Sequence, residues 1–510
     1  MLWTAAAYRA TFDIARPIAA ASPCACSYNQ VRVTSVAVRT SEGTVVTLER
    51  NTVEDLRGHL RGALLLPGDP GYDDGRAIWN AMIDRRPALI ARCLGVADVV
   101  TCVNFAREHG VTVSIKGGGH NISGLAVCDG GLMVDLSLMR GVWVDSTART
   151  ARAQAGCLLG DLDRETQLHG LAAVLGFLST TGIAGLTLGG GFGYLTRRFG
   201  WSCDNVLSMD VVTADGRFVR ASARENHDLF WGLRGGGGNF GVVTSFEYKL
   251  HPVGPEVMAG AMAWRAEDAH EVLEMYRTVT AQAPPELTCV AVLRNAPPAP
   301  WLPKEIHGKP IVAIFVCQTG PRAEGERQVA PIKRFGSPVG DIIQWRPYVS
   351  QQSLLDATQP KGRRYYWKSE YLPRHEPDML AKVIEHAKRI PSPHSAILVF
   401  PIDGALNRLS AEHSPAGNRD AASVLNITAS WERADDDKAN IGWARAAWED
   451  LRPFSTGGTY VNFLTEEEGS DRVHAAYGEN YDRLVEIKTK WDSNNVFRMN
   501  KNIPPTAPDA

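Results

Sequence analysis

Three glycine-rich segments lie within about 130 residues of one another and constrain what this chain can fold into. They read SIKGGGHNISG at 114–124, GFLSTTGIAGLTLGGGFGYLTRRFG at 176–200 and RGGGGNFG at 234–241. Glycine in regular structure costs about 0.5–1 kcal/mol relative to alanine, so such dense use needs a reason. Tight turns between strands would explain one segment. Three segments in one region favour a close approach of the backbone to a ligand.

The ligand that such loops suit best is an anion. Consecutive backbone N–H groups form an anion-binding concavity, and each charge-assisted hydrogen bond contributes about 1.5–3 kcal/mol. A pyrophosphate can accept several of these bonds, so the sequence predicts a dinucleotide. Gly236, Gly238 and Gly241 also satisfy GxGxxG, the spacing of nicotinamide cofactor sites, but a helical pattern precedes them and a strand follows. A nicotinamide dehydrogenase is an alternative that depends on this spacing alone.

Composition limits the partners and the compartment. The 510 residues predict two or three domains, and a formal net charge of -2 gives no basic excess for nucleic acid or an anionic membrane. No apolar run approaches the roughly 20 residues that span a bilayer. The alanine-rich N-terminus is interrupted by Arg9, Asp13 and Arg16, so it lacks a clean signal core. We therefore expect a cytoplasmic protein without nucleic-acid or membrane partners.

The nine cysteines are scattered and odd in number, which argues against a disulfide framework. Cys24 and Cys26 form a lone CxC without a second pair. We expect buried thiols and no metal site.

Hydrophobic periodicity predicts mixed helices and strands. The ordered fold is expected to begin near residue 50, where Thr52 and Asp55 have capping-box spacing. The segment HPVGP at 251–255 is typical of a domain junction. Before this junction we expect a helix at 98–109, a strand before the first glycine loop and a hairpin at 206–220. After the junction we expect helices at 267–282, 377–390 and 437–452 and strands at 289–293, 311–317, 341–348, 395–400 and 423–431. The chain is expected to end with a long helix at 471–492 and an irregular tail.

Several motifs, in this order, resemble the FAD-linked oxidoreductases of the vanillyl-alcohol oxidase superfamily, most closely the bacterial berberine-bridge-enzyme-like branch. They are KGGGHNISG, DGGLMVDLS, STTGIAGLTLGGGFG, RGGGGNFGVVTSFEY and NNVFRMNKNIPP. The resemblance implies an α+β, two-lobed FAD-binding fold whose substrate lobe is an antiparallel sheet covered by helices. The implied parts are an extension of unknown role (1–52), an FAD-binding domain (53–252), a substrate domain (253–454) and a C-terminal segment that returns to the FAD domain (455–510).

The resemblance also implies the residues that hold FAD. The first loop would wrap the pyrophosphate, the second would line the flavin and pyrophosphate, and the third would hold the adenine side. Asn500 and Asn502 would lie near the flavin edge. The implied cofactor-binding residues are Lys116, Gly117, Gly118, Gly119, His120, Asn121, Ser123, Gly124, Ser179, Thr180, Gly182, Gly185, Thr187, Gly189, Gly190, Gly191, Gly193, Gly241, Val242, Asn500 and Asn502.

In similar proteins the histidine at the position of His120 is bonded to the 8α-methyl group of the flavin. Neutral imidazole is a competent nucleophile toward an electrophilic methyl group. Some relatives add a second bond from a cysteine in GxCPTxG, but here the segment is GFLSTTG and Leu178 takes that place. The resemblance therefore implies a single attachment, through His120.

The catalytic base stays open at this stage. Plant relatives have a candidate tyrosine in YxNYR, but here the segment is TYVNFL, with Phe463 in that place; Tyr460 and Asn462 remain. A tyrosine base needs a lowered pKa, and Lys368 in RRYYWKSEYL could supply the charge. The alternative for that run is a strand with aromatic packing. A glutamate of some relatives is replaced, we expect by Val424.

The reaction implied is oxidation of a small organic substrate, an alcohol, sugar, amine or secondary metabolite, by hydride transfer to flavin. Oxygen or another acceptor would reoxidise the flavin, and Ile183, at the place of an oxygen gatekeeper in some relatives, favours a dehydrogenase. The alternative is a flavin-binding scaffold without redox turnover.

Overall fold

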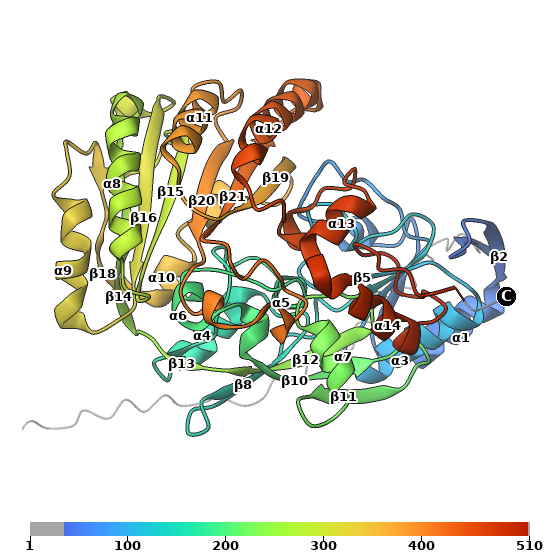
Figure 1. Ribbon diagram of the computed structural model, residues 1–510. Helices are drawn as coiled ribbons and strands as arrows, with labels where there is room; N and C mark the ends of the chain where they lie inside the picture. Colours follow the sequence, from blue (N-terminus) through green and yellow to red (C-terminus); the bar gives the residue numbers. More distant parts are fainter. Residues whose placement is uncertain (1–34, 508–510) are drawn as a thin grey trace, which may run out of the picture. The chain divides into compact units, whose positions relative to one another are not determined.

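The computed structural model describes residues 35–507. They form two lobes built on separate sheets, joined by the chain at 251–255 (Figure 1). This confirms the predicted two-lobed α+β fold.

The first lobe contains a four-stranded sheet of order β3-β4-β6-β5 and a five-stranded sheet of order β11-β10-β12-β8-β7. Strand β6 pairs in parallel with both β4 and β5, so the first glycine loop leaves the edge strand β5 at a carboxyl end. The elements are α1 (Arg50–His59), β3 (Ala63–Leu65), α2 (Tyr72–Arg76), β4 (Leu89–Arg92), α3 (Val96–Glu108), β5 (Val113–Lys116), β6 (Leu132–Asp135), β7 (Val142–Asp145), β8 (Thr150–Gln154), α4 (Leu159–Gln167), β9 (Leu171–Ala172), α5 (Ile183–Leu188), α6 (Thr196–Phe199), β10 (Val206–Val212), β11 (Phe218–Ser222), α7 (His227–Leu233), β12 (Val242–Lys249) and β13 (His251–Pro252).

The start of the fold differs from the prediction. Strands β1 (Ser35–Arg39) and β2 (Val45–Glu49) form a hairpin, and the amide of Arg39 donates to the Gly130 carbonyl at 2.7 Å. Helix α1 begins at Arg50 without a side-chain cap, so the capping box at Thr52 and Asp55 was wrong. The expected extension 1–52 therefore contains strands of the first lobe from residue 35 onward, while residues 1–34 lie outside the described part.

The second lobe is one antiparallel sheet of order β17-β14-β16-β15-β20-β21-β19, with β18 pairing to β14. Its alternating strands and helices were largely predicted, but β14 and α9 were not assigned, β19 was expected only as the alternative for the run RRYYWKSEYL, and 341–348 divides into two short strands. The elements are β14 (Glu256–Arg265), α8 (Ala269–Gln282), β15 (Leu287–Asn295), β16 (Pro310–Gln318), α9 (Arg322–Lys333), β17 (Gly340–Asp341), β18 (Gln344–Pro347), α10 (Tyr348–Gln352), β19 (Arg364–Leu372), α11 (Pro377–Ala387), β20 (Ala396–Pro401), β21 (Ser423–Trp431) and α12 (Asp437–Leu451).

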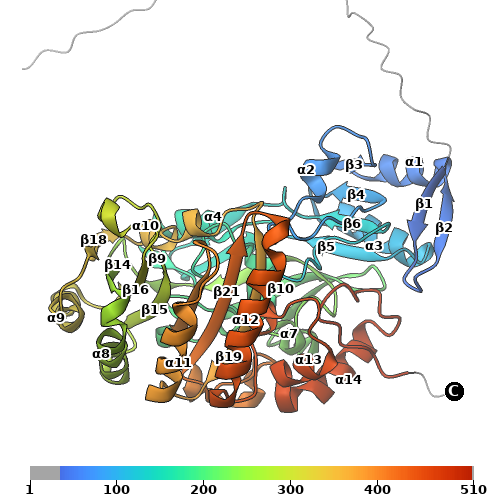
Figure 2. The same cartoon turned by 90° about the horizontal axis from the view of Figure 1, so that it is seen from above.

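The two faces of this sheet have different neighbours. Helices α8, α11 and α12 cover one face (Figures 1 and 2), where Ala291 and Leu293 of β15 pack into a helix-side core. The alternate residues Val290 and Val292 belong to a separate cluster that also contains Phe192 and Tyr460. The side-chain period of two thus leaves one face of the sheet for a site.

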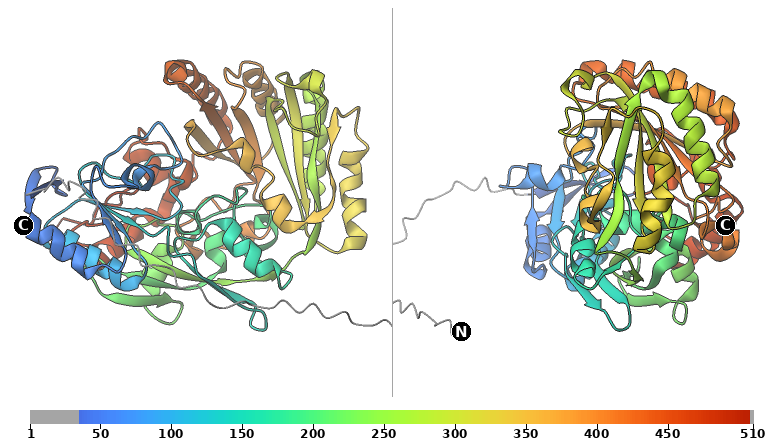
Figure 3. Two further views of the ribbon diagram at one scale, coloured as in Figure 1. Left: turned by 180° about the vertical axis from the view of Figure 1, so that it is seen from behind. Right: turned by 90° about the vertical axis from the view of Figure 1, so that its left-hand side faces the viewer.

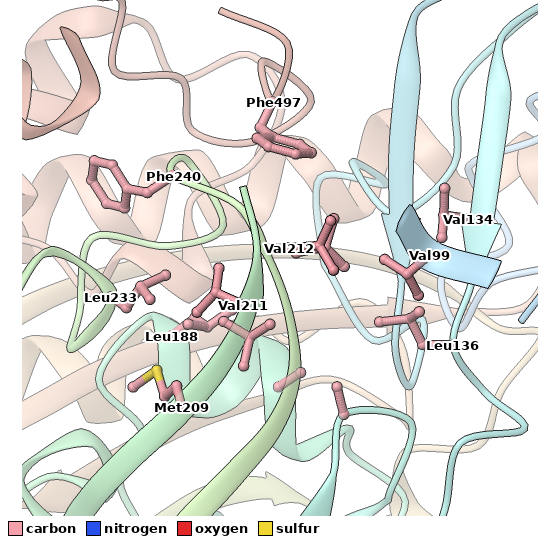
Figure 4. Packing of buried hydrophobic residues seen from close by; sticks show 14 of the residues in the cluster. Val99, Val134, Leu136, Leu188, Met209, Val211, Val212, Leu233, Phe240 and Phe497 are labelled. Carbon is pink, nitrogen blue, oxygen red and sulfur yellow. The ribbon is translucent and has the colours of Figure 1, made fainter. Parts of the chain in front are cut away.

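The C-terminal segment packs against the first lobe. Leu484, Phe497 and Ile503 belong to the same buried cluster as the strands of that lobe, and Figure 4 shows Phe497 with Phe240 and Val211. Seen from behind, the red C-terminal helices lie among blue and green elements (Figure 3). The predicted helix 471–492 was wrong in one respect, because it divides into α13 (Ser470–Tyr477) and α14 (Tyr481–Trp491) at Gly478, whose φ is 54°.

Within residues 35–507 the seven cysteines are buried and free, as expected, whereas Cys24 and Cys26 lie outside this range. In the same part of the chain, no helix has the length and apolar character that crossing a membrane requires.

A buried ion pair fixes the C-terminal segment. Lys488 Nζ lies 2.6 Å from Asp492 Oδ2, and both side chains are fully inaccessible. The ammonium also donates to the carbonyls of Asn239 at 2.8 Å and Phe497 at 3.2 Å. Burial lowers the pKa of Lys488, and Asp492 opposes that shift. The pair therefore joins α14, the third glycine segment and the tail.

We expect Lys488→Met to reduce the free energy of unfolding by about 3–5 kcal/mol, because it leaves a buried carboxylate without its cation. Chemical denaturation followed by circular dichroism measures this change. The matched control is Lys490→Met on the same helix, whose exposed ammonium pairs with Asp228 and should contribute less than about 1 kcal/mol. Equal losses in the two variants would contradict the assignment.

Candidate functional site

A cavity of about 310 Å³ is lined by the glycine loops of the first lobe, the C-terminal segment and the open face of the second sheet. Its aromatic wall includes Phe177, Phe192, Phe315 and Phe400. Of the residues predicted for the site, the cavity lining contains Gly117, Gly118, Gly119, His120, Asn121, Gly182, Gly185, Gly241, Val242, Tyr460, Asn462 and Asn500.

The first glycine loop presents unused hydrogen-bond donors. Strand β5 ends at Lys116, and none of the five amides of residues 117–121 donates to another residue within 35–507. Gly119 has a φ of +67°, a conformation that favours glycine. A run of free amides at a cavity wall is suited to an anion with several oxygens, such as a pyrophosphate.

The second loop lies directly against the first. A Cβ added to Gly118 would stand 2.5 Å from the amide nitrogen of Gly182 and 2.6 Å from its Cα. No side chain fits between these backbones, so each position requires glycine. The contact sets how closely the two loops enclose the cavity.

The third loop continues the same wall. Helix α7 precedes it and strand β12 follows it, so the GxGxxG spacing has the wrong context for a nicotinamide site, as predicted. The amides of Gly238 and Gly241 make no hydrogen bond within the described residues, while Asn500 Nδ2 donates to the Gly238 carbonyl at 3.0 Å. The loop is thus held by the C-terminal tail.

His120 lies at the cavity wall with an unused nitrogen. Its Nε2 is buried and has no partner among the described residues, and its ring stacks on Trp79 with centroids 4.3 Å apart. Burial lowers the pKa of His120 to about 4. The imidazole is therefore neutral near pH 7, the form that can act as a nucleophile.

Trp79 and Asn80 support His120, and sequence reasoning missed both. The Trp79 amide donates to the Gly119 carbonyl at 2.9 Å, and its ring also stacks on Tyr365 at 3.6 Å. Asn80 Nδ2 donates to the carbonyls of Ile122 at 3.1 Å and Tyr365 at 3.0 Å, which joins the glycine loop to β19. No motif marks these residues, because only the tertiary contact brings them to the loop.

Tyr460 and Asn462 form a hydrogen-bonded pair at the cavity. The Tyr460 hydroxyl accepts from Gly191 N at 3.0 Å and from Asn462 Nδ2 at 2.9 Å, and the Asn462 amide also donates to the Leu186 carbonyl at 3.2 Å. Burial raises the pKa of Tyr460, although both hydrogen bonds act in the opposite direction. A neutral phenol with both lone pairs engaged has its proton available to donate.

The structure corrects the hypothesis for Lys368. Its ammonium lies 3.1 Å from Glu467 and 3.4 Å from Glu468, and the residue is not part of the cavity lining. Lys368 is neutralised by these carboxylates, so it does not supply a charge that lowers the pKa of Tyr460. The alternative, an aromatic strand, is what β19 forms, with Tyr365 and Trp367 on the cavity side.

Other predicted residues support the loops from behind. Lys116 donates to the Gly75 carbonyl at 2.6 Å, Ser179 binds Asp356, and Thr187 lies 2.8 Å from the Tyr248 hydroxyl. Asn502 Oδ1 is buried without a partner among the described residues. The predicted cofactor residues outside the cavity lining are Lys116, Ser123, Gly124, Ser179, Thr180, Thr187, Gly189, Gly190, Gly191, Gly193 and Asn502.

Two cationic side chains and no carboxylate of the described residues line the cavity. The cationic side chains are those of Arg294 and Lys501. Burial lowers the pKa of Lys501 to about 8 and that of Arg294 to about 10. Sequence reasoning named neither residue, although Lys501 stands between the two predicted asparagines.

Comparison with known proteins gives consistent matches over most of the chain. The family model described as FAD binding domain matches residues 87–222, and the model described as berberine and berberine like matches 459–504. The chain is 31% identical to an FAD-linked oxidoreductase of Dictyostelium discoideum over 84% of its length and 91% of the relative. It is also 31% identical to (R)-6-hydroxynicotine oxidase of Paenarthrobacter nicotinovorans over 88% of its length and 97% of the relative.

A solved structure extends the match to three dimensions. The crystal structure of 6-hydroxy-D-nicotine oxidase from Arthrobacter nicotinovorans superposes with a TM-score of 0.78 and 28% identity. It covers 87% of this chain and 98% of that protein.

Gly118→Ala should destabilise the protein by about 1–3 kcal/mol, because its Cβ would overlap the Gly182 backbone and push the loops apart. The matched control is Gly185→Ala on the same cavity wall, where an added Cβ has no atom within 4 Å. We expect unchanged or slightly higher stability there. Denaturant unfolding of both variants measures the difference, and a Gly118→Ala variant as stable as Gly185→Ala would contradict the close contact.

Proposed function

Because this chain belongs to the berberine-bridge-enzyme-like family of FAD-linked oxidoreductases, we propose that it binds FAD in this cavity through one covalent bond to His120. We further propose that it oxidises a small organic substrate, with oxygen or another compound as the final electron acceptor. The observation that carries the proposal is the neutral His120 imidazole, whose unpartnered Nε2 lies at the wall built from the glycine loops.

The loops supply what a dinucleotide needs. The free amides of residues 117–121 would hold the pyrophosphate, and those of Gly238 and Gly241 would hold the adenine side. Asn500, whose amide donates to the Gly238 carbonyl at 3.0 Å, would lie beside the third loop, and Asn502 lies outside the cavity lining. Bound FAD supplies the chemistry of accepting a hydride from substrate, and the protein supplies binding, orientation and exclusion of water.

Several features favour attachment at His120 alone. Stacking on Trp79 fixes the ring, and burial keeps it neutral and therefore nucleophilic near pH 7. Leu178 lines the cavity where a second attachment would require a thiol. Single attachment is therefore the arrangement that these residues support.

Tyr460 would act on the substrate as a hydrogen-bond donor rather than as a base. Its hydroxyl oxygen already accepts two hydrogen bonds, so its own proton is directed to a substrate oxygen or nitrogen. Asn462 is a positioning residue that orients the phenol from its anchor on the Leu186 carbonyl. Together they would hold the reacting group and select its orientation.

His120→Ala should abolish covalent attachment. Yellow colour should remain in the acid precipitate of the wild type and be released from that of the variant. The matched control is His251→Gln: His251 also stacks on an aromatic ring, and burial lowers its pKa to about 4, but its Nε2 lies 2.7 Å from Asn205 Oδ1. The control should retain the bound flavin. Wild-type precipitate without colour would refute the attachment, and attached flavin that no substrate bleaches would support a redox-inactive scaffold.

Tyr460→Phe should slow flavin reduction about 10- to 100-fold with unchanged flavin content, because one hydrogen bond to the reacting group is lost. Anaerobic stopped-flow absorbance measures the reduction rate directly. Tyr371→Phe is the control, since Tyr371 is buried in the same cluster but does not line the cavity. Equal rates for wild type and Tyr460→Phe would exclude this contact.

A further inference from the structure

A row of residues crosses the open face of the second sheet at the cavity. Arg294 of β15 pairs with Ala396 of β20, Ala396 pairs with Thr428 of β21, and Thr428 pairs with Trp367 of β19. All four line the cavity. With strands about 4.8 Å apart, the backbones of Arg294 and Trp367 stand roughly 14 Å apart along this row.

The Trp367 end of the row adjoins the proposed attachment site. The Trp367 ring meets that of Trp79 edge-on at 5.4 Å, and Trp79 stacks on His120. Arg294 is at the opposite end. A ligand placed along the row would therefore have one end near the flavin and the other near a guanidinium.

The polar groups of this face lack protein partners. Within residues 35–507, Trp367 Nε1 is a buried donor without an acceptor. Asn426 lies two residues before Thr428 on the same face of β21, is 3% exposed, and has an Oδ1 without a partner in the same range. Buried polar groups are normally hydrogen-bonded, so unpaired groups lining a cavity indicate that a ligand completes them.

Arg294 is also without a counter-ion in the described part of the chain. Its guanidinium donates to two backbone carbonyls, of Asn295 at 3.1 Å and Pro393 at 3.4 Å, and no carboxylate of the described residues lies within ion-pair distance. The like charge of Arg363 adds to burial in lowering its pKa. A partly buried guanidinium of this kind is suited to a carboxylate, which it can bind with two parallel hydrogen bonds.

We propose that the substrate is an apolar or aromatic molecule carrying a carboxylate, and that Arg294 binds this group while the opposite end of the molecule is oxidised. The inference rests on the proposed function and names the substrate class of the same site. Phe315 and Phe400, which also line the cavity, would contact the apolar body, and Thr428 and Asn426 would supply further polar contacts.

The test uses flavin-loaded protein and two probes of equal size, 3-phenylpropanoate and 3-phenylpropanamide. Binding is measured by isothermal titration calorimetry and by perturbation of the flavin absorbance. The wild type should bind the acid at least tenfold more tightly than the amide. Arg294→Gln should weaken acid binding roughly 10- to 100-fold and leave amide binding unchanged, and Arg294→Lys should restore part of the preference.

Arg346→Gln is the matched control. Arg346 is a partly buried arginine of β18 in the same sheet, also without a carboxylate partner among the described residues, and it does not line the cavity. It should keep the wild-type preference. The inference is overturned if the wild type binds acid and amide equally, or binds neither. It is also overturned if Arg294→Gln still binds the acid more tightly than the amide.

Loss of bound flavin in Arg294→Gln would also overturn the carboxylate inference, because Arg294 would then contribute to cofactor binding. Flavin content, read from the visible spectrum before each titration, separates this inference from the proposed function. Wild-type protein that never binds flavin refutes the proposed function. Flavin-loaded wild type without a preference for the acid refutes only the carboxylate.

Discussion

The contact between the backbones of Gly118 and Gly182 is the constraint on which the site depends. Because neither residue has a side chain, two loops from different parts of the first lobe touch at main-chain distance. The amides of residues 117–121 donate to no other residue within 35–507, and all five residues line the cavity. An anion bound to the loop, as proposed for the pyrophosphate, would pair these amides and recover the stability that is lost while they are unpaired.

The same geometry determines the state of His120. Trp79 fixes the Gly119 carbonyl through its amide and the His120 ring through stacking, so the loop and the imidazole are positioned by one residue. Burial holds the pKa of the imidazole well below its usual range. Burial alone accounts for this neutrality, because no charged side chain acts on the pKa of His120. The lining also contains Lys501 and Arg294 and, in the described chain, no carboxylate, so a neutral histidine lies in a cavity with two cationic side chains.

The parts of the fold and of the candidate site that could be predicted from the sequence are those marked by a pattern of neighbouring residues. The glycine loops, the hairpin at 206–220 and strand β21 have local patterns and were found. The break at Gly478 was missed because helical periodicity continues on both sides of it. Lys368 was misplaced for the opposite reason, since its charge is cancelled by Glu467 and Glu468 from a distant segment. Trp79, Arg294 and Asn426 carry no motif, and only the pairing of strands and loops brings them to the cavity.

The second sheet explains how substrate recognition can be separate from folding. Along β15, Ala291 and Leu293 pack in the helix-side core, whereas Val292 and Arg294 line the cavity. Substitution of a helix-side residue creates a hole in a close-packed interior, with a loss of about 2–5 kcal/mol for a large side chain. A cavity-side residue faces open space rather than core, so we expect its substitution to change the chemistry of the cavity wall with little effect on the core. The two lobes would therefore divide the work under the proposed function: the glycine loops would hold the cofactor, and the cavity face of the second sheet would select the substrate.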